Sequence, residues 1–293
     1  MDDLVPVLMN SKAGGMHDSS AEVQLKKIAN DAGLPIRVIK TATPEAFKAE
    51  LAKIIHAKEP KVAIAGGDGT VALAVQELAC TNTALGILSQ GTFNNFASTL
   101  RLPHNLPLAM KALKNGKATC VDLGKVGDRY FTESCGIGIF ADALALYGKG
   151  TNKNFFRGLY ALTRLALEFR PCPVTLTLDG KDQTENVTIC EVCNTYRIGQ
   201  AAPIAPGASV TDGLLDIVVF SDLSRREVPE YMKALRAQMH LGLPKVKAFR
   251  AKEVTIRPGR RRNVHADDQV VGNSPVAITV VPGALKVLTD QEL

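Results

Sequence analysis

Short apolar runs alternate with polar, helix-forming stretches over the first 120 residues. Four apolar runs predict buried strands, at residues 5–9, 36–39, 62–65 and 85–88. Three intervening segments predict helices, at residues 19–33, from Thr43-Pro44 onward, and at residues 71–78. Ser19 and Glu22 have the spacing of a capping box, and Pro44 suits the first turn of a helix. Apolar strands that alternate with helices are typical of a parallel sheet with both faces covered, so we expect a doubly wound α/β domain here.

The pattern changes near residue 120, where we place a domain boundary. Seven strand-like segments follow, at residues 121–127, 129–140, 174–180, 187–194, 213–220, 253–259 and 276–281. Two helical stretches interrupt them, at residues 154–169 and 225–241. The second half therefore predicts a β-rich, sandwich-like domain with inserted helices.

Composition places the chain among globular proteins. Its 293 residues are 46% hydrophobic and 22% charged, which excludes disordered, collagen-like and small disulfide-scaffold classes. Six cysteines are scattered, and the Cys190/Cys193 pair lies within a predicted strand. Buried thiols are the commoner case for such a pair, with a metal or redox role as the alternative. The acidic start MDDLVPVLMN is unlike a signal peptide, so we expect a cytoplasmic protein.

Positive charge is concentrated in one block. The chain carries a net charge of +6, but residues 225–262 alone carry +9, because this block contains twelve Lys and Arg residues and only three Glu residues. Such a block suggests an anionic partner, although a solvated basic face is a sufficient explanation for any one of these charges. Nucleic acid is a poorer fit, because the block lacks interleaved aromatic residues and any recognised motif.

The strongest local motif is Gly66-Gly67-Asp68-Gly69-Thr70, which follows an apolar strand and opens a helix. Glycines allow close approach of a ligand to the backbone, and a helix N-terminus favours phosphate. Asp68 could hold Mg²⁺, directly or through water, and Thr70 could cap the helix or contact a phosphate oxygen. A tight strand–helix turn without any ligand is the alternative. The motif is neither a Walker A loop nor a G-x-G-x-x-G loop.

Two further polar, Gly-rich loops follow predicted strands. Residues 9–15 contain Asn10, Lys12 and Gly14, and residues 89–95 contain Gly91, Thr92 and Asn94. Loops at the carboxyl ends of parallel strands converge where open α/β sheets bind ligands. These six residues therefore join residues 66–70 as candidate nucleotide-binding positions.

Taken together, these motifs resemble the diacylglycerol-kinase catalytic-domain superfamily, which includes bacterial lipid kinases and sphingosine and ceramide kinases and is distantly related to NAD kinases. The matching segments are Asn10 to Gly15, the GGDGT of residues 66–70, the G-T-x-N of residues 91–94, Val121 to Gly124, Gly136 to Gly138, Ala205-Pro206 with the D-G-L-L-D of residues 212–216, and Pro282 to Leu285. GGDGT alone is shared with NAD kinases, whereas the ordered set is far more specific.

The resemblance implies an ATP-dependent lipid kinase with two domains. Residues 1–120 with 283–293 would form the nucleotide domain, and residues 121–282 the lipid-substrate domain. ATP would lie in the cleft, and a lipid hydroxyl such as that of diacylglycerol would attack its γ-phosphate. A structural Mg²⁺ would bind Asp212 and the carbonyls of Ser209 and Leu214. The alternative for Asp212 is an ordinary hairpin turn.

Four positions depart from the family pattern. Ala72-Leu73 replaces Asn-Glu after GGDGT, Asn95 replaces an Asp, and Ser89-Gln90 replaces the Pro before Gly91. The family's D-G-E motif becomes Asp267-Asp268-Gln269.

The last departure bears directly on catalysis. Gln269 cannot accept a proton as a base, whereas the family's Glu is the assigned proton acceptor. In an extended chain Asp267 would share a face with Gln269, which makes Asp267 the candidate replacement base. We therefore expect a slow or altered kinase, with a nucleotide- and lipid-binding pseudokinase and a NAD kinase-like enzyme as alternatives. His265, close to this motif, could contact phosphate or could be a packed or surface histidine.

A kinase that acts on membrane lipid has to reach an anionic surface. Residues 225–262 are the predicted docking region for anionic phospholipid, with peripheral membrane association and no nucleic-acid partner. Both a monomer and a homodimer are compatible with the sequence.

Overall fold

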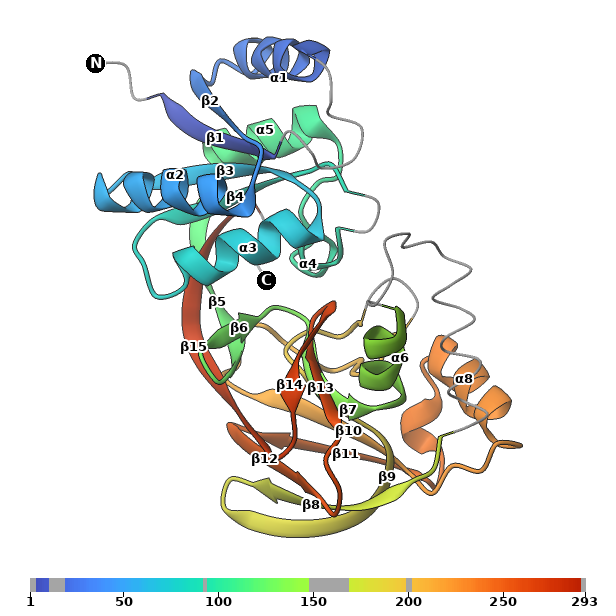
Figure 1. Cartoon of the computed structure of the whole chain (residues 1–293). Coiled ribbons are helices and arrows are strands. Elements are labelled where there is room, and N and C mark those ends of the chain that lie inside the picture. Colours follow the sequence, from blue (N-terminus) through green and yellow to red (C-terminus); the bar gives the residue numbers. More distant parts are fainter. Residues whose placement is uncertain (1–3, 11–18, 92–93, 148–168, 199–201, 291–293) are drawn as a thin grey trace. The chain divides into compact units, whose positions relative to one another are not determined.

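The computed structural model describes residues 4–10, 19–91, 94–147, 169–198 and 202–290 of the chain (Figure 1). It divides into two compact units. Unit 1 comprises Met1–Asp122 with Pro282–Leu293, and unit 2 comprises Leu123–Val281. None of the helices in the described segments has the length and apolar character needed to cross a membrane.

Unit 1 is built on a parallel sheet. Its strands lie in the order β2 (Ile36–Thr41), β1 (Val5–Asn10), β3 (Lys61–Gly66) and β4 (Ala84–Ser89). The last part of β15 (Val276–Thr289) joins this sheet parallel to β4, with Val287 opposite Leu85. Strands β1, β3 and β4 are almost completely buried, as expected for a sheet that is covered on both faces, whereas the edge strand β2 is partly exposed.

The described part of this unit contains five helices: α1 (Ser19–Asp31), α2 (Pro44–His56), α3 (Asp68–Leu78), α4 (Asn95–Thr99) and α5 (Leu106–Asn115). Helices α1 and α5 pack on one face of the sheet, where Val7 and Met9 meet Leu25 and Met110 in one apolar cluster. Helices α2 and α3 pack against each other on the opposite face. The predicted cap of α2 is confirmed, because Thr43 Oγ1 accepts a hydrogen bond from Ala46 N at 3.2 Å.

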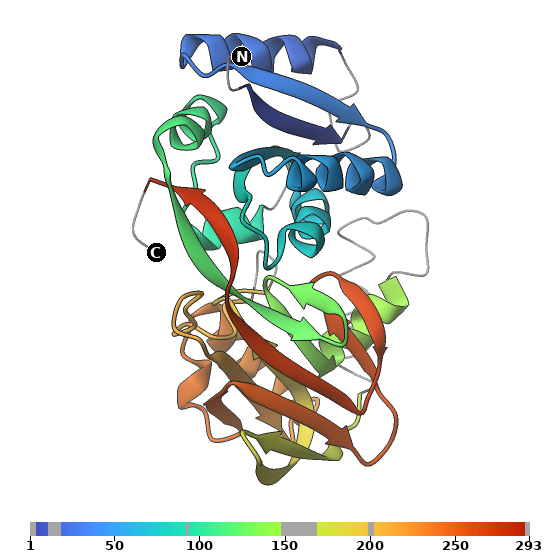
Figure 2. The same ribbon diagram turned by 90° about the vertical axis from the view of Figure 1, so that its left-hand side faces the viewer.

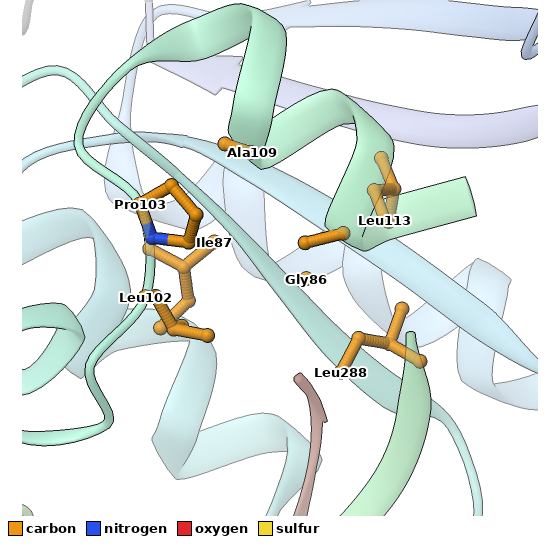
Figure 3. A pocket seen from close by; sticks show the side chains of 8 residues that line it. Gly86, Ile87, Leu102, Pro103, Ala109, Leu113 and Leu288 are labelled. Atoms are coloured by element: carbon orange, nitrogen blue, oxygen red, sulfur yellow. The ribbon is translucent and has the colours of Figure 1, made fainter. Parts of the chain in front are cut away.

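A small apolar gap lies under α5. Gly86, Ile87, Leu102, Leu113 and Leu288 contribute to its lining, and its volume is about 10 Å³ (Figure 3). A cavity of this size holds one water at most. The gap is therefore a packing defect and not a ligand site.

Unit 2 is a network of antiparallel strands. The strands are β5 (Lys117–Val126), β6 (Arg129–Phe131), β7 (Ser134–Gly138), β8 (Cys172–Leu178), β9 (Lys181–Cys193), β10 (Leu215–Ser221), β11 (Val246–Ala251), β12 (Glu253–Pro258), β13 (Asn263–Ala266), β14 (Gln269–Asn273) and β15. They run in the order β14-β13-β7-β9-β8-β12-β15, while β10 pairs with β9 and β11, and β5 pairs with β6 and β15. Figure 2 shows these strands from the side. The predicted α/β half and β-rich half are confirmed.

Three helical segments are described in unit 2: α6 (Ile139–Tyr147), α8 (Val228–Arg236) and the 3-10 turn η1 (His240–Gly242). The expected continuous strand over residues 129–140 is wrong. The chain turns between β6 and β7, and α6 begins immediately after Gly138, whose φ of +108° ends the strand. The helix expected over 225–241 is shorter, and Gln238 (φ +58°) lies just beyond its end. The helix expected at 154–169 lies almost wholly outside the described residues.

The cysteine pair is packed in the core. Cys190 and Cys193 are buried and free, and they belong to two different apolar clusters. Burial, with the nearby Glu191 carboxylate, raises the pKa of both thiols. These surroundings are those of inert structural thiols.

Candidate active site

The GGDGT segment forms a sharp turn from β3 into α3. Gly67 is the N-cap residue, and the helix begins at Asp68, three residues earlier than the sequence predicted. A Cβ atom on Gly66 would lie 2.7 Å from Thr70 Cβ, so only glycine allows Thr70 to pack there. Thr70 is buried, while Asp68 is partly exposed and Gly69 is exposed. The first turn of α3 thus presents backbone N–H groups and one carboxylate at the end of the sheet, a geometry suited to phosphate.

The loop after β4 packs directly on this turn. A Cβ atom on Gly91 would lie 2.5 Å from Gly67 Cα, so the two glycines meet backbone to backbone. Gln90 N also donates a hydrogen bond to Gly66 O at 3.0 Å. The structure therefore brings together two of the three predicted loops. In the first loop Asn10 ends β1, while Lys12 and Gly14 lie outside the described residues.

Asp68 and Asn94 organise these two loops. Asp68 Oδ1 accepts a hydrogen bond from Asn95 N at 2.7 Å, which ties α3 to the start of α4. Asn94 adopts a left-handed conformation (φ +50°) and exchanges two hydrogen bonds with Gly91: its Nδ2 donates to Gly91 O at 2.8 Å, and its Oδ1 accepts from Gly91 N at 3.0 Å. The amide of Asn94 thus shapes the loop. Thr92 lies outside the described residues.

Gln90, which in the sequence is only a departure from the family pattern, lies in the same loop as Gly91. Both polar atoms of its side-chain amide are buried, as is Ser89 Oγ, and none of them has a hydrogen-bond partner within the described structure. A buried polar group without a partner is costly unless a ligand or water satisfies it. Since Gln90 follows β4 and precedes Gly91, its amide is placed where a bound nucleotide could satisfy it. The only available signal was its position at a strand end.

The Asp267-Asp268-Gln269 motif forms a tight hairpin turn. Asp267 and Asp268 are the two turn residues between β13 and β14, and Asp267 has φ +49°. The extended conformation assumed from the sequence is therefore wrong, and the argument that placed Asp267 and Gln269 on one face fails. Asp268 and Gln269 are exposed, whereas Asp267 turns back into unit 2.

The Asp267 carboxylate binds the turn between β6 and β7. Its oxygens accept hydrogen bonds from Glu133 N at 2.7 Å, Thr132 N at 3.0 Å, Thr132 Oγ1 at 3.2 Å and Ser134 N at 3.4 Å. Burial raises the pKa of Asp267, and these donors oppose the rise. Both oxygens are engaged, so these contacts anchor the hairpin. The role of Asp267 as a base stays a prediction.

His265 lies beneath the same hairpin. It is fully buried on β13, and its ring nitrogens face the Glu191 carboxylate and the Asp267 carbonyl. A phosphate contact for His265 is therefore excluded in this conformation, because the ring has no exposed surface.

The predicted magnesium ligands in unit 2 are partly engaged. Asp212 forms an ion pair with Arg250, which also lies 3.5 Å from Asp216, and Asp212 Oδ1 accepts a hydrogen bond from Leu214 N at 3.1 Å. Ser209 Oγ lies 3.1 Å from Thr211 Oγ1. A Mg²⁺ ion bound at Asp212 would share this carboxylate with Arg250 or displace it. Across the described segments, no three His, Cys, Asp or Glu side chains gather as a metal site. The site at Ser209, Asp212 and Leu214 stays a prediction.

Comparison with known proteins assigns both halves of the chain. Residues 5–126 match the diacylglycerol kinase catalytic domain, and residues 139–289 match the YegS C-terminal NAD kinase beta sandwich-like domain. A diacylglycerol kinase of Mycobacterium tuberculosis is 33% identical over 242 residues, which cover 78% of this chain and 76% of the relative. The chain belongs to the diacylglycerol kinase family. The resemblance inferred from the motifs is thereby confirmed.

Other members of the diacylglycerol kinase family agree. A diacylglycerol kinase of Bacillus subtilis is 27% identical over 222 residues, covering 72% of this chain and 71% of the relative. A crystal structure of a diacylglycerol kinase from Bacillus anthracis superposes with a TM-score of 0.73 at 20% identity and covers 98% of this chain and 97% of that one. The structural likeness confirms the fold, including the sandwich-like second half.

Proposed function

We propose that this protein transfers the γ-phosphoryl group of ATP to a lipid hydroxyl, with diacylglycerol as the first substrate to test. The observation that carries the proposal is the close approach of Gly67 and Gly91 beside the first turn of α3. Family membership supports a kinase and ATP as its phosphoryl donor.

The nucleotide half of the reaction uses unit 1. Backbone N–H groups of residues 67–69 are positioned to bind phosphate oxygens, and the α3 dipole favours the negative charge. Asp68 fits as a magnesium ligand, because its carboxylate stands at this turn and oxygen ligands suit Mg²⁺. Mg²⁺ bound there would neutralise charge on the transferred phosphoryl group.

The acceptor half uses the hairpin of unit 2. Gln269 is exposed and cannot take the hydroxyl proton, and the Asp267 carboxylate is engaged by Thr132 and Glu133. Phosphoryl transfer depends mainly on positioning and on charge neutralisation, so the reaction can proceed without a strong base. A missing general base costs about 10²–10⁴-fold in rate. We therefore propose a slow kinase.

The same hairpin contacts support a second candidate, a pseudokinase that binds nucleotide and lipid without catalysis. The NAD kinase-like alternative is less favoured, because the relatives that match both halves are named diacylglycerol or lipid kinases.

One assay separates these functions. Purified protein is incubated with γ-labelled ATP, Mg²⁺ and a panel of diacylglycerols, sphingoid bases and NAD, and the products are resolved. Labelled lipid supports the kinase. Binding of an ATP analogue without any labelled lipid would favour the pseudokinase, and label on NAD would favour the NAD kinase-like enzyme.

Access to the lipid requires contact with a membrane surface. We propose that residues 225–262 supply this contact through anionic phospholipid, giving a cytoplasmic protein with peripheral membrane association. Homodimer formation stays an open prediction.

A further inference from the structure

The basic block of residues 225–262 is not uniformly available for binding. Five of its twelve cations form ion pairs: Lys245 with Glu227, Lys247 with Glu185, Arg250 with Asp212, Arg257 with Asp182, and Arg262 with Asp142. The other seven have no acidic partner among the described residues: Arg225, Arg226, Lys233, Arg236, Lys252, Arg260 and Arg261.

Four of these seven cations gather at one helix. Arg225 and Arg226 immediately precede α8, and Lys233 and Arg236 lie within it. All four are exposed, and positions 233 and 236 share a helix face because they are three residues apart. The opposite face of α8 is fixed to unit 2 through buried Tyr231 and Leu235. The helix therefore presents its charge outward from a packed base.

Two large apolar side chains are exposed immediately after this helix. Met239 is 71% exposed and Leu241 is 42% exposed. Between them, His240 is fully buried, with Nε2 2.8 Å from Ile204 O and its ring stacked on Phe220 at 5.9 Å. The buried histidine fixes the turn, so its two apolar neighbours are held at the surface.

Exposed cations beside exposed apolar side chains are the pattern of an interfacial membrane contact. Cations attract anionic headgroups, and apolar side chains gain by leaving water at the headgroup boundary. A nucleic acid would use the cations but not Met239 and Leu241. The one aromatic residue of α8, Tyr231, is buried, so stacking on bases is also unsupported.

We propose that α8 and η1 form a membrane-docking face, made of Arg225, Arg226, Lys233, Arg236, Met239 and Leu241, whose partner is an anionic lipid bilayer. The proposal deepens the proposed lipid kinase function, because it names the surface through which such an enzyme reaches its substrate. It narrows the docking region proposed for residues 225–262 to these six residues.

The test is flotation of the purified full chain with vesicles, without ATP. Phosphatidylglycerol–phosphatidylcholine vesicles and pure phosphatidylcholine vesicles are compared at low and high salt. The triple variant R226Q/K233Q/R236Q is matched by K252Q/R260Q/R261Q, which removes the same charge from cations that are also unpaired. M239S/L241S is matched by L108S, because Leu108 on α5 is 51% exposed. Thermal unfolding checks that each variant is folded.

We expect wild type to bind only the anionic vesicles and to be released by high salt. R226Q/K233Q/R236Q should weaken binding at least tenfold, and K252Q/R260Q/R261Q less than threefold. M239S/L241S should weaken binding several-fold, and L108S should not change it. Equal losses in the two triple variants, or no vesicle binding at low salt, would overturn the docking face. Binding of nucleic acid alone, lost with the same triple variant, would also overturn it.

Kinase activity is measured separately on a water-soluble, short-chain diacylglycerol. The docking variants should retain activity on this substrate while they lose activity on vesicles. If wild type has no kinase activity while the docking variants lose vesicle binding, the proposed function is wrong and the docking face stands.

Discussion

The Nε2 atom of His265 lies 2.9 Å from Oε2 of Glu191, and neither side chain has any exposed surface. The other ring nitrogen, Nδ1, lies 3.1 Å from the carbonyl oxygen of Asp267. Both nitrogens face acceptors, which favours the doubly protonated ring. Burial alone lowers the pKa of His265, but the Glu191 carboxylate and the Asp267 carbonyl outweigh it and raise the pKa above its ordinary value. This pair ties β9 to the hairpin of the Asp267-Asp268-Gln269 motif.

Glu191→Gln should destabilise the protein strongly. Removal of one member of a buried charge pair leaves the other charge without compensation and costs about 3–5 kcal/mol. We expect the free energy of unfolding in urea to fall by this order. Glu227→Gln is the matched control, because it breaks the partly exposed pair with Lys245 at 2.7 Å and should have a much smaller effect. Equal effects of the two changes would contradict the account.

Stability should decrease as pH rises through neutrality. The pKa of His265 is raised in the folded state, so folding favours the protonated ring, and this contribution is present below pH about 6.5, the ordinary value. It is lost as pH rises through the folded-state pKa. The titratable groups that act on the ring are Glu191 on β9 and Asp267 in the hairpin turn. The raised pKa of Asp267 acts in the same direction, because protonation of its carboxyl is also favoured in the folded state.

Urea unfolding of wild type and His265→Gln between pH 6 and 8.5 checks this expectation. The stability difference between the two proteins should shrink as pH rises. A difference that is constant across this range, or that grows, would show that His265 does not titrate as inferred.

The variants Asp267→Asn and Asp267→Ala distinguish whether Asp267 anchors the hairpin or acts as the catalytic base. The Asn oxygen can still take the place of Oδ1, which accepts hydrogen bonds from Glu133 N at 2.7 Å and Thr132 N at 3.2 Å, and only the contacts of Oδ2 are lost. Ala offers no acceptor at all and leaves the N–H groups of the turn unpaired. We expect Ala to lower both the melting temperature and the kinase rate, and Asn to retain most of both. A loss of rate by 10² or more in the Asn variant, at unchanged melting temperature, would restore Asp267 as the base.

Asp68→Asn should remove Mg²⁺-dependent nucleotide binding while the fold is kept. The Asn oxygen can accept the hydrogen bond from Asn95 N, so the contact between α3 and α4 survives, but the charge that suits Mg²⁺ is gone. Calorimetric titration with an ATP analogue should show affinity reduced at least tenfold with Mg²⁺ and little changed without it. Unchanged affinity with Mg²⁺ would refute this role.

The parallel strands β1, β3 and β4 of unit 1 could be predicted because each is a short, buried apolar run, and the edge strand β2 because it carries three β-branched apolar residues between helix signals. Thr43-Pro44 likewise predicted the start of α2, and the GGDGT segment predicted the turn from β3 into α3. The expectation failed at residues 129–140, where two apolar strands flank a polar turn and Gly138 then leads into α6. Helix α5 was also missed, although Asn105 caps it by accepting a hydrogen bond from Leu108 N.

The site was less predictable because its decisive contacts join distant parts of the chain. The hydrogen bond from Thr132 to Asp267 spans 135 positions, and the Glu191–His265 pair spans 74. The ion pairs of the basic block also had no signal in the sequence. The sequence does not distinguish its twelve cations, whereas the structure shows that five of them are ion-paired.

The most direct test of the central claim is transfer of label from ATP to diacylglycerol in mixed micelles, with ATP labelled at the γ or the α position. The account predicts a labelled lipid phosphate from γ-labelled ATP alone, dependent on Mg²⁺ and lost in Asp68→Asn. Absence of labelled lipid from folded wild-type protein that still binds an ATP analogue would contradict it.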